Sequence, residues 1–297
     1  MYPDPYHEYF RLIDQAGIFD NSRQSMFPQT VCAKVIRRHF ERAGKAPKAL
    51  IIGFDGTRAD SMCFLVKGAN ETVSGVRFHS EYSAVNMLKT EGGLYLSYAG
   101  GEPDAPQETS TPQGWTSILT GEWGSVNGVL QHAPLSTACP TVLRELAQQG
   151  KTTAFLAEWD DHFTITYREE MAVAQRKGLP FVFQQFKDDE ALEKSMLSNI
   201  QKGTDCIFGI FEAPDHNGHS FGFGKQEYRY VTAVCNLDRI AFRLLQEVES
   251  RPTYHEEDWL FLITSDHGGH GNMHGTQLDE DRTTFIACNK KLPEYLL

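Results

Sequence analysis

Three short apolar runs, each followed within a few residues by an aspartate, constrain the fold of this chain more than any other feature of its sequence. Uninterrupted apolar runs of this length are typical of strands buried on both faces of a parallel sheet. The carboxyl ends of parallel strands meet at one edge of the sheet, where open α/β folds bind their ligands. We therefore expect three carboxylates at one edge: Asp55 after residues 48–54, Asp215 after 205–211 and Asp266 after 259–263.

Helical patterns separate these strands along the chain. Candidate helices at 31–40, 83–90, 139–149, 188–201 and 225–251 alternate with candidate strands at 48–54, 94–98, 151–157, 181–184, 205–211, 259–263 and 283–288. This order predicts an α/β fold with a mainly parallel central sheet and helices on both faces. We expect residues 1–297 to form a single domain, in which 60–105 is a small cap or active-site excursion, or else surface loops.

Composition narrows the class of protein. A hydrophobic content of 40% and a charged content of 23% are ordinary for a soluble globular protein. The net charge of −11 argues against a nucleic-acid polymer as partner, although bound metal cations can still attract a small anionic substrate. No apolar run approaches the roughly 20 residues of a membrane span, and the N-terminus lacks the pattern of a signal peptide. With six scattered cysteines, expected to be free thiols, we predict a cytoplasmic protein without membrane association; the sequence does not set its oligomeric state.

A histidine-rich run follows the strand at 259–263. Residues 263–275 contain Asp266, His267, His270 and His274, separated mainly by glycines. Glycine lets the backbone turn tightly, so several side chains can converge on one point. Aspartate with several histidines is a ligand set typical of zinc or manganese. Alternatively, the run is a polar surface turn.

Two further stretches supply candidate functional groups. Asp215 and His219 are four residues apart, a spacing that lets both side chains face one ion on a helical turn or in a bent loop. Ser110 and Thr111 precede Pro112, which fits the first position of a helix, and Thr111 then fits the N-cap. A hydroxyl at a helix N-terminus is also placed where free N–H groups stabilise an alkoxide and the anion that it attacks. An ordinary N-cap is the alternative.

Four stretches together resemble the alkaline phosphatase superfamily, in particular its nucleotide pyrophosphatase/phosphodiesterase-like branch. They are IIGFDGTRAD at 51–60, STPQGWTSILTG at 110–121, PDHNGHSFG at 214–222 and TSDHGGHGNMHG at 264–275. They occur in the order found in the family, and the resemblance spans residues 48 to 288. It implies a three-layer α/β sandwich that forms a catalytic domain.

The resemblance also implies a site and a reaction. Asp55, Asp266 and His267 would hold one divalent ion, to which the nucleophile also binds, and Asp215, His219 and His274 would hold a second. Zinc is the expected metal and manganese the alternative. Such a pair clamps a phosphoryl group. The expected protein is a hydrolase of small anionic phosphate esters that forms a covalent phospho-threonine. Phosphodiesters, nucleotide pyrophosphates, phosphomonoesters and phosphonates are all compatible with it.

The chain departs from the family pattern at the nucleophile. Phosphodiesterase-like members usually have proline two positions after it, whereas Pro112 directly follows Thr111. The position of the nucleophile depends on the landmark that is used: its spacing to residues 120–121 selects Thr111, whereas its spacing to Pro112 selects Ser110. We favour Thr111 because it can cap the helix. There is no C-x-P-x-R signature, so a formylglycine sulfatase is not expected. His216 and His270 are expected to lie outside the ligand set, with His270 as the alternative to His274. Residues 158–163 are expected to contact substrate.

Two other functions compete with this interpretation. Residues 218–222 match the nucleophile-elbow pattern G-x-S-x-G around Ser220, which suggests a metal-independent serine hydrolase. That elbow needs a strand running straight into the serine, and Pro214 and Asn217 intervene. The other alternative is a non-catalytic protein that binds a phosphate metabolite.

Overall fold

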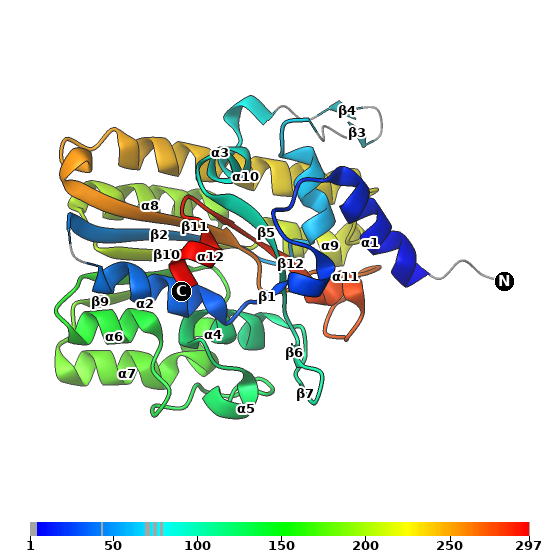
Figure 1. Cartoon of the computed structure of the whole chain (residues 1–297). Coiled ribbons are helices and arrows are strands. Elements are labelled where there is room, and N and C mark those ends of the chain that lie inside the picture. The colour runs from blue at the N-terminus through cyan, green and yellow to red at the C-terminus, as the bar shows by residue number, and fades with distance from the viewer. Residues whose placement is uncertain (1–4, 43, 69–71, 74–75, 78–79, 297) are drawn as a thin grey trace.

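The predicted fold class is confirmed by the computed structural model, which describes residues 5–42, 44–68, 72–73, 76–77 and 80–296 (Figure 1). Its eight-stranded central sheet has the order β1-β5-β12-β11-β2-β10-β8-β9. Strand β12 runs antiparallel to both of its neighbours, and the other pairs are parallel. The strands are β1 (Phe27–Pro28), β2 (Ala46–Phe54), β5 (Gly93–Tyr98), β8 (Thr153–Ala157), β9 (Phe181–Gln185), β10 (Cys206–Phe211), β11 (Glu257–Thr264) and β12 (Thr283–Cys288).

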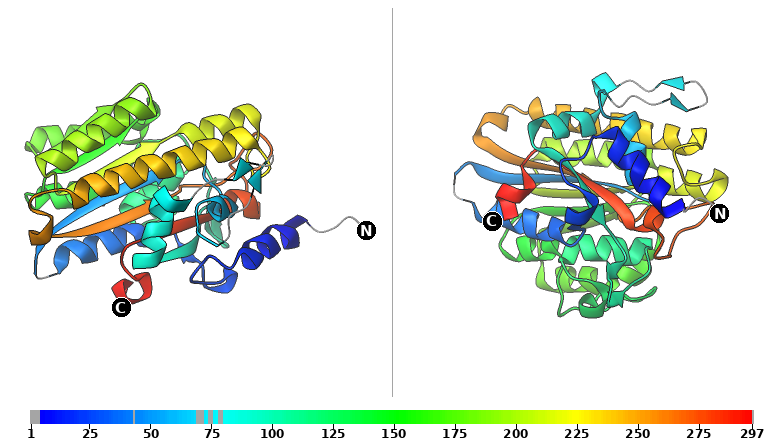
Figure 2. Two further views of the ribbon diagram at one scale, coloured as in Figure 1. Left: turned by 90° about the horizontal axis from the view of Figure 1, so that it is seen from above. Right: turned by 45° about the vertical axis from the view of Figure 1, so that its right-hand side comes forward.

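Helices cover both faces of the sheet. Helices α3, α8 and α10 lie on one face and α2, α4, α6 and α7 on the other (Figure 1). Figure 2 shows α8 and α10 side by side across the first face. The helices are α1 (Pro5–Ala16), α2 (Val31–Glu41), α3 (Ala84–Glu91), α4 (Thr111–Thr120), α5 (Gly124–Asn127), α6 (Val142–Gln148), α7 (Arg168–Lys177), α8 (Asp189–Lys202), α9 (Ala213–Phe221), α10 (Tyr228–Glu249), α11 (Asp279–Arg282) and α12 (Leu292–Leu296).

The sheet divides the core into two apolar layers. Alternate side chains of β2 belong to different layers. Leu50 and Ile52 point into the layer under α8 and α10, whereas Ala49 and Ile51 point into the layer under α2 and α4. Successive side chains of a strand face opposite sides, so a strand covered by helices on both faces is apolar at every position. This is why the central strands are recognisable as continuous apolar runs.

The segment 60–105 contributes to the main body as well as to its surface. Helix α3 packs against α10, and β5 is a strand of the central sheet. Two small hairpins, β3–β4 (Thr72–Val73 with Val76–Arg77) and β6–β7 (Gly101–Glu102 with Ala105–Pro106), stand outside that sheet. Parts of the expected cap, at 69–71, 74–75 and 78–79, lie outside the described residues. The domain assignment stays a prediction.

Two smaller expectations concern thiols and the membrane. All six cysteines are free, and five of them are buried, as expected. Among the described residues, no helix combines the length and the apolar character needed to cross a bilayer.

Candidate metal centre and active site

Three neighbouring parallel strands bring the candidate ligands to one edge of the sheet. Asp55 directly follows β2, and its N–H donates to the carbonyl of Phe211 at the end of β10 at 3.0 Å. Helix α9, which follows β10, carries Asp215 and His219. Asp266 lies just past the end of β11. Since β2 lies between β10 and β11, the predicted convergence of three aspartates is observed.

The first cluster is fully enclosed and contains Asp55, Asp266 and His267. The Nε2 atom of His267 lies 3.6 Å from Asp55 Oδ1 and 3.3 Å from Asp266 Oδ2. The other two carboxylate oxygens accept hydrogen bonds from groups outside the cluster. Trp115 Nε1 donates to Asp55 Oδ2 at 2.9 Å, and the Gly56 N–H donates to Asp266 Oδ1 at 3.2 Å. Asp55 Oδ1 and Asp266 Oδ2 are buried without a partner among the described residues. Buried carboxylate oxygens without a donor are suited to a cation.

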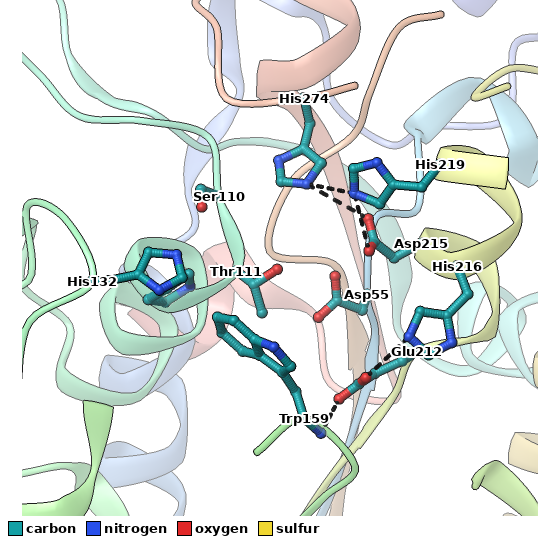
Figure 3. A pocket seen from close by; sticks show the side chains of 11 residues that line it. Asp55, Ser110, Thr111, His132, Trp159, Glu212, Asp215, His216, His219 and His274 are labelled. Carbon is teal, nitrogen blue, oxygen red and sulfur yellow. Dashed lines mark hydrogen bonds and ion pairs between the residues drawn. The ribbon is translucent and has the colours of Figure 1, made fainter. Parts of the chain in front are cut away.

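The second cluster contains Asp215, His219 and His274 (Figure 3). The Nε2 atoms of His219 and His274 lie 3.5 Å and 3.8 Å from the Asp215 carboxylate and 3.1 Å from each other. Their Nδ1 atoms are 3.0 Å from the carbonyl oxygens of Asn272 and Thr109. A carbonyl only accepts, so each Nδ1 carries the proton and each Nε2 turns a lone pair toward the cluster. Facing lone pairs are stabilised by a cation between them.

The two clusters are adjacent. The ring of His267 stacks on that of His274 with centroids 3.9 Å apart. His267 follows the same tautomer rule, because its Nδ1 lies 2.7 Å from the Gly268 carbonyl. Its Nε2 is therefore also free to bind a metal. Among the described residues, Asp55, Asp266 and His267 converge as three possible metal ligands, and a second such group joins Asp215 and His274 with His267 instead of His219.

Electrostatics favour divalent cations at both clusters. Burial, followed by the neighbouring aspartates, raises the pKa of Asp55 and of Asp266 well above the usual range. Burial raises the pKa of Asp215 to about 7 and lowers the pKa of His267 and of His274. Three buried carboxylates repel one another, and neutral imidazoles supply no countercharge. The donor set, its orientation and its unbalanced charge fit two divalent ions.

The start of α4 differs from expectation. Ser110 has extended dihedrals (φ −140°, ψ 153°) and occupies the N-cap position, and Thr111 is the first helical residue. The expectation that Thr111 caps the helix is wrong, and with it the reason for preferring Thr111 over Ser110. The helix begins one residue before Pro112, because the Ser110 carbonyl accepts from the Gly114 N–H at 2.9 Å and proline is tolerated throughout a first turn.

Thr111 is nevertheless the hydroxyl that faces the first cluster. Its Oγ1 lies 3.3 Å from His267 Nε2. Gly114 lets α4 approach this closely, since a Cβ at that position would lie 2.7 Å from the Asp266 carbonyl oxygen. Ser110 lines the same pocket, but no hydrogen bond joins its hydroxyl to the described ligands.

A pocket of about 340 Å³ opens above Thr111 (Figure 3). Beyond the ligands it is lined by residues to which the sequence assigned no role, or only substrate contact: His132, Trp159, Glu212 and His216. From the segment 158–163, Trp159 reaches this pocket, whereas His162 is buried among aromatic rings. No described residue of 60–105 lines it. Glu212 was detectable, because it too follows a buried strand; His132 lies in an irregular segment with no pattern.

The remaining sequence candidates lie apart from the two clusters. His270 Nδ1 is 2.7 Å from Oδ1 of the buried Asp281, outside both clusters as expected. His216 is more than half exposed and contacts Glu212 at 3.5 Å. Ser220 lies inside α9 rather than between a strand and a helix, so the nucleophile elbow of a serine hydrolase is absent there.

Comparisons with known proteins agree with this arrangement. Residues 140–281 match the family model of type I phosphodiesterase / nucleotide pyrophosphatase. A search of curated proteins found no match. The fold resembles a putative sulfatase from Bacteroides thetaiotaomicron, with a TM-score of 0.56, 13% identity, and coverage of 83% of this chain and 65% of that one.

Two other solved structures have the same fold. A protein of the alkaline phosphatase superfamily from Vibrio parahaemolyticus gives a TM-score of 0.53 at 13% identity, over 96% of this chain and 69% of that one. Murine ectonucleotide pyrophosphatase/phosphodiesterase 5, an inactive variant in complex with AMP, gives 0.50 at 13% identity, over 75% of this chain and 57% of that one. The fold and the site thus define an α/β protein of the alkaline phosphatase type. Over residues 140–281 the chain resembles the type I phosphodiesterase / nucleotide pyrophosphatase family, and its fold resembles that of the alkaline phosphatase superfamily.

Proposed function

We propose that this protein is a metal-dependent phosphoric ester hydrolase of the phosphodiesterase type, with Thr111 as its nucleophile. The observation that carries the proposal is the 3.3 Å contact between Thr111 Oγ1 and His267 Nε2, beside carboxylate oxygens that have no other partner. Asp55, Asp266 and His267 would hold one divalent ion, with Thr111 at the same ion; Asp215, His219 and His274 would hold the other. Zinc fits these nitrogen and oxygen ligands, and manganese is the alternative.

The chain's own residues then perform a double displacement. Bound divalent ions would favour the ionised form of a hydroxyl and balance charge on the phosphoryl group. Thr111 Oγ1 forms a bond to phosphorus while the bond to the leaving oxygen breaks, which gives a covalent phospho-threonine. Water then displaces Thr111 from phosphorus. The free N–H groups in the first turn of α4 stabilise the anionic phosphoryl group in both steps.

The test compares hydroxyl variants on a panel of 4-nitrophenyl esters: a phosphodiester, a phosphomonoester, a phosphonate and a sulfate, with zinc or manganese. Thr111→Ala is expected to lower kcat by on the order of 10³-fold or more while metal content is unchanged. Thr111→Ser should retain part of the activity, and Ser110→Ala is the matched control. Full activity of Thr111→Ala, or its loss in Ser110→Ala alone, would show that the nucleophile is assigned wrongly.

Metal stoichiometry tests the ligands separately. Asp215→Asn and His274→Ala are each expected to lower bound metal to about one ion per chain, because the second cluster loses a donor. Unchanged stoichiometry by elemental analysis would contradict the ligand assignment. A protein that binds both metals and phosphate but turns over no ester would be the non-catalytic binder instead.

A further inference from the structure

A second group of carboxylates lies beside the nucleophile. Glu158 follows β8 and Glu212 follows β10, and these strands are paired in parallel, so both residues reach the edge that holds Asp55. Glu212 lines the Thr111 pocket with its side chain only 6% exposed (Figure 3). Glu158, Glu212 and His216 offer ligand atoms that all lie within 4.8 Å of one another. The pocket therefore has the proposed metal ligands on one side and Glu212 on another, with Glu158 close to Glu212.

Among the described residues, this second group of acids has no lysine or arginine partner. Glu212 Oε1 accepts the Trp159 N–H at 2.6 Å, but Oε2 accepts no hydrogen bond from a described residue, since its contact with His216 Nε2 is 3.5 Å long. Asp189 adds a third carboxylate, whose Oδ1 accepts the Glu212 N–H at 3.1 Å. Within the described chain, no lysine or arginine forms an ion pair with Glu158, Glu212 or Asp189.

Such a carboxyl group holds either a proton or a cation. Burial, then the negative charges of Asp55, Glu158 and Asp189, raise the pKa of Glu212 to about 9. Burying an unpaired carboxylate is costly, and a cation bound at Oε2 would remove that cost. Glu212 lines the pocket, so the cation would come from what the pocket binds (Figure 3).

An organic ammonium group fits the surroundings of Glu212 better than a third metal ion does. A structural metal needs about four ligands, whereas here one glutamate oxygen is already committed and the single imidazole is more than half exposed. Trp159 lines the same pocket, with its ring held edge-to-face by His132 at 5.4 Å and 88°. An aromatic ring beside carboxylates is the usual surroundings of a bound ammonium group.

We propose that Glu212 and Glu158 select phosphate esters in which a group esterified to the scissile phosphate carries an ammonium nitrogen. This inference rests on the proposed function and names its substrate class. A second phosphate at that position would bring no positive charge to these acids, so nucleoside di- and triphosphates and other pyrophosphates are expected to be poor substrates.

The experiment measures a preference ratio. The zinc-loaded protein is assayed with 2-aminoethyl 4-nitrophenyl phosphate and n-propyl 4-nitrophenyl phosphate, which differ in charge at nearly equal size. The kcat/KM ratio is expected to favour the amine by at least about tenfold, the factor given by one charge-assisted hydrogen bond. The ratio should fall toward one in Glu212→Gln and decrease in Glu158→Gln. Glu256→Gln, at a side chain 69% exposed, is the control in which the ratio stays at the wild-type value.

Two further measurements separate this inference from the catalytic proposal. Calorimetry with 2-aminoethyl phosphate and n-propyl phosphate on metal-loaded Thr111→Ala measures the same preference without turnover. Amine preference in binding with no turnover by the wild type would overturn the hydrolase and keep the amine site. Turnover without any preference, or a third zinc ion in the wild type that Glu212→Gln loses, would overturn the amine site. Circular dichroism verifies that each variant is folded.

Discussion

Trp115 Nε1 donates a 2.9 Å hydrogen bond to Asp55 Oδ2, joining the middle of α4 to the end of β2. The indole is fully buried, so this bond fixes the carboxylate with its other oxygen toward His267. Trp115 thus joins α4, which carries the proposed nucleophile Thr111, to Asp55, a proposed metal ligand.

Trp115→Phe should therefore weaken metal binding at the first cluster. Phenylalanine keeps most of the apolar volume but leaves Asp55 Oδ2 without its donor. Loss of such a supporting bond typically lowers metal affinity by about 10- to 100-fold. Competition with a chromogenic chelator measures the affinity, and Trp123→Phe, whose indole donates to Glu102 instead, is the control. Equal affinities in wild type and Trp115→Phe would contradict this role.

The same indole explains a glycine in β2. A Cβ on Gly53 would lie 2.5 Å from the ring of Trp115, which is buried on all sides and cannot move away. Gly53→Ala is expected to destabilise the fold by roughly 1–3 kcal/mol and to displace α4. Gly209→Ala, on the adjacent strand β10, is the matched comparison because its Cβ would meet only the flexible end of Met196. Urea unfolding should rank Gly53→Ala as clearly less stable; the reverse order would refute the argument.

The predictable parts of the fold were those that leave a pattern in the sequence of a single strand or helix. Central strands contain an uninterrupted apolar run because both faces are covered there, and the predicted strand at 283–288 coincides with β12. Its antiparallel direction was not predictable, because it follows from a connection at 265–282 that contains only the short α11 instead of a crossover helix. The edge where Asp55, Asp215 and Asp266 meet followed from topology alone.

The parts that were not predictable depend on contacts between distant segments. The donor on Asp55 comes from Trp115, and the carbonyl that sets the tautomer of His274 comes from Thr109. Neither pairing has a signature in the sequence. The N-cap error has a local cause: Pro112 is compatible with several first-turn positions, so it could not distinguish Ser110 from Thr111. A cytoplasmic location stays a prediction.

Removal of metal should destabilise the whole protein. Without cations, the buried oxygens Asp55 Oδ1, Asp215 Oδ1 and Asp266 Oδ2 lack partners and their charges repel. A ligand that binds only the folded state stabilises it by about 2.7 kcal/mol at a concentration 100 times its Kd. Dialysis against a chelator is therefore expected to lower Tm by several degrees, and added zinc should restore it. An identical Tm before and after chelation, with metal loss verified, would contradict the proposed centre.

Acid should weaken an interaction at the opposite end of β11. Glu257, its first residue, accepts from Arg251 Nη2 at 2.7 Å and from Trp259 Nε1 at 2.7 Å. Burial alone would raise the pKa of Glu257, but hydrogen bonds from Arg251, Trp259 and Thr253 outweigh it and lower the pKa to about 2. Because the folded pKa lies below the ordinary 4.5, this stabilisation is complete above pH 4.5 and is lost as the pH falls toward 2.

Glu257→Gln should remove this pH-dependent part of the stability. At pH 7 the variant is expected to be less stable than wild type by roughly 1–3 kcal/mol, because a buried, charge-assisted network loses its anion. The difference should shrink as the pH falls from 4.5 to 2, whereas Glu256→Gln, at the exposed neighbouring residue, should follow the wild type throughout. Thermal unfolding across this pH range measures it. Parallel curves for wild type and Glu257→Gln would mean that Arg251 does not hold Glu257 ionised in the folded state.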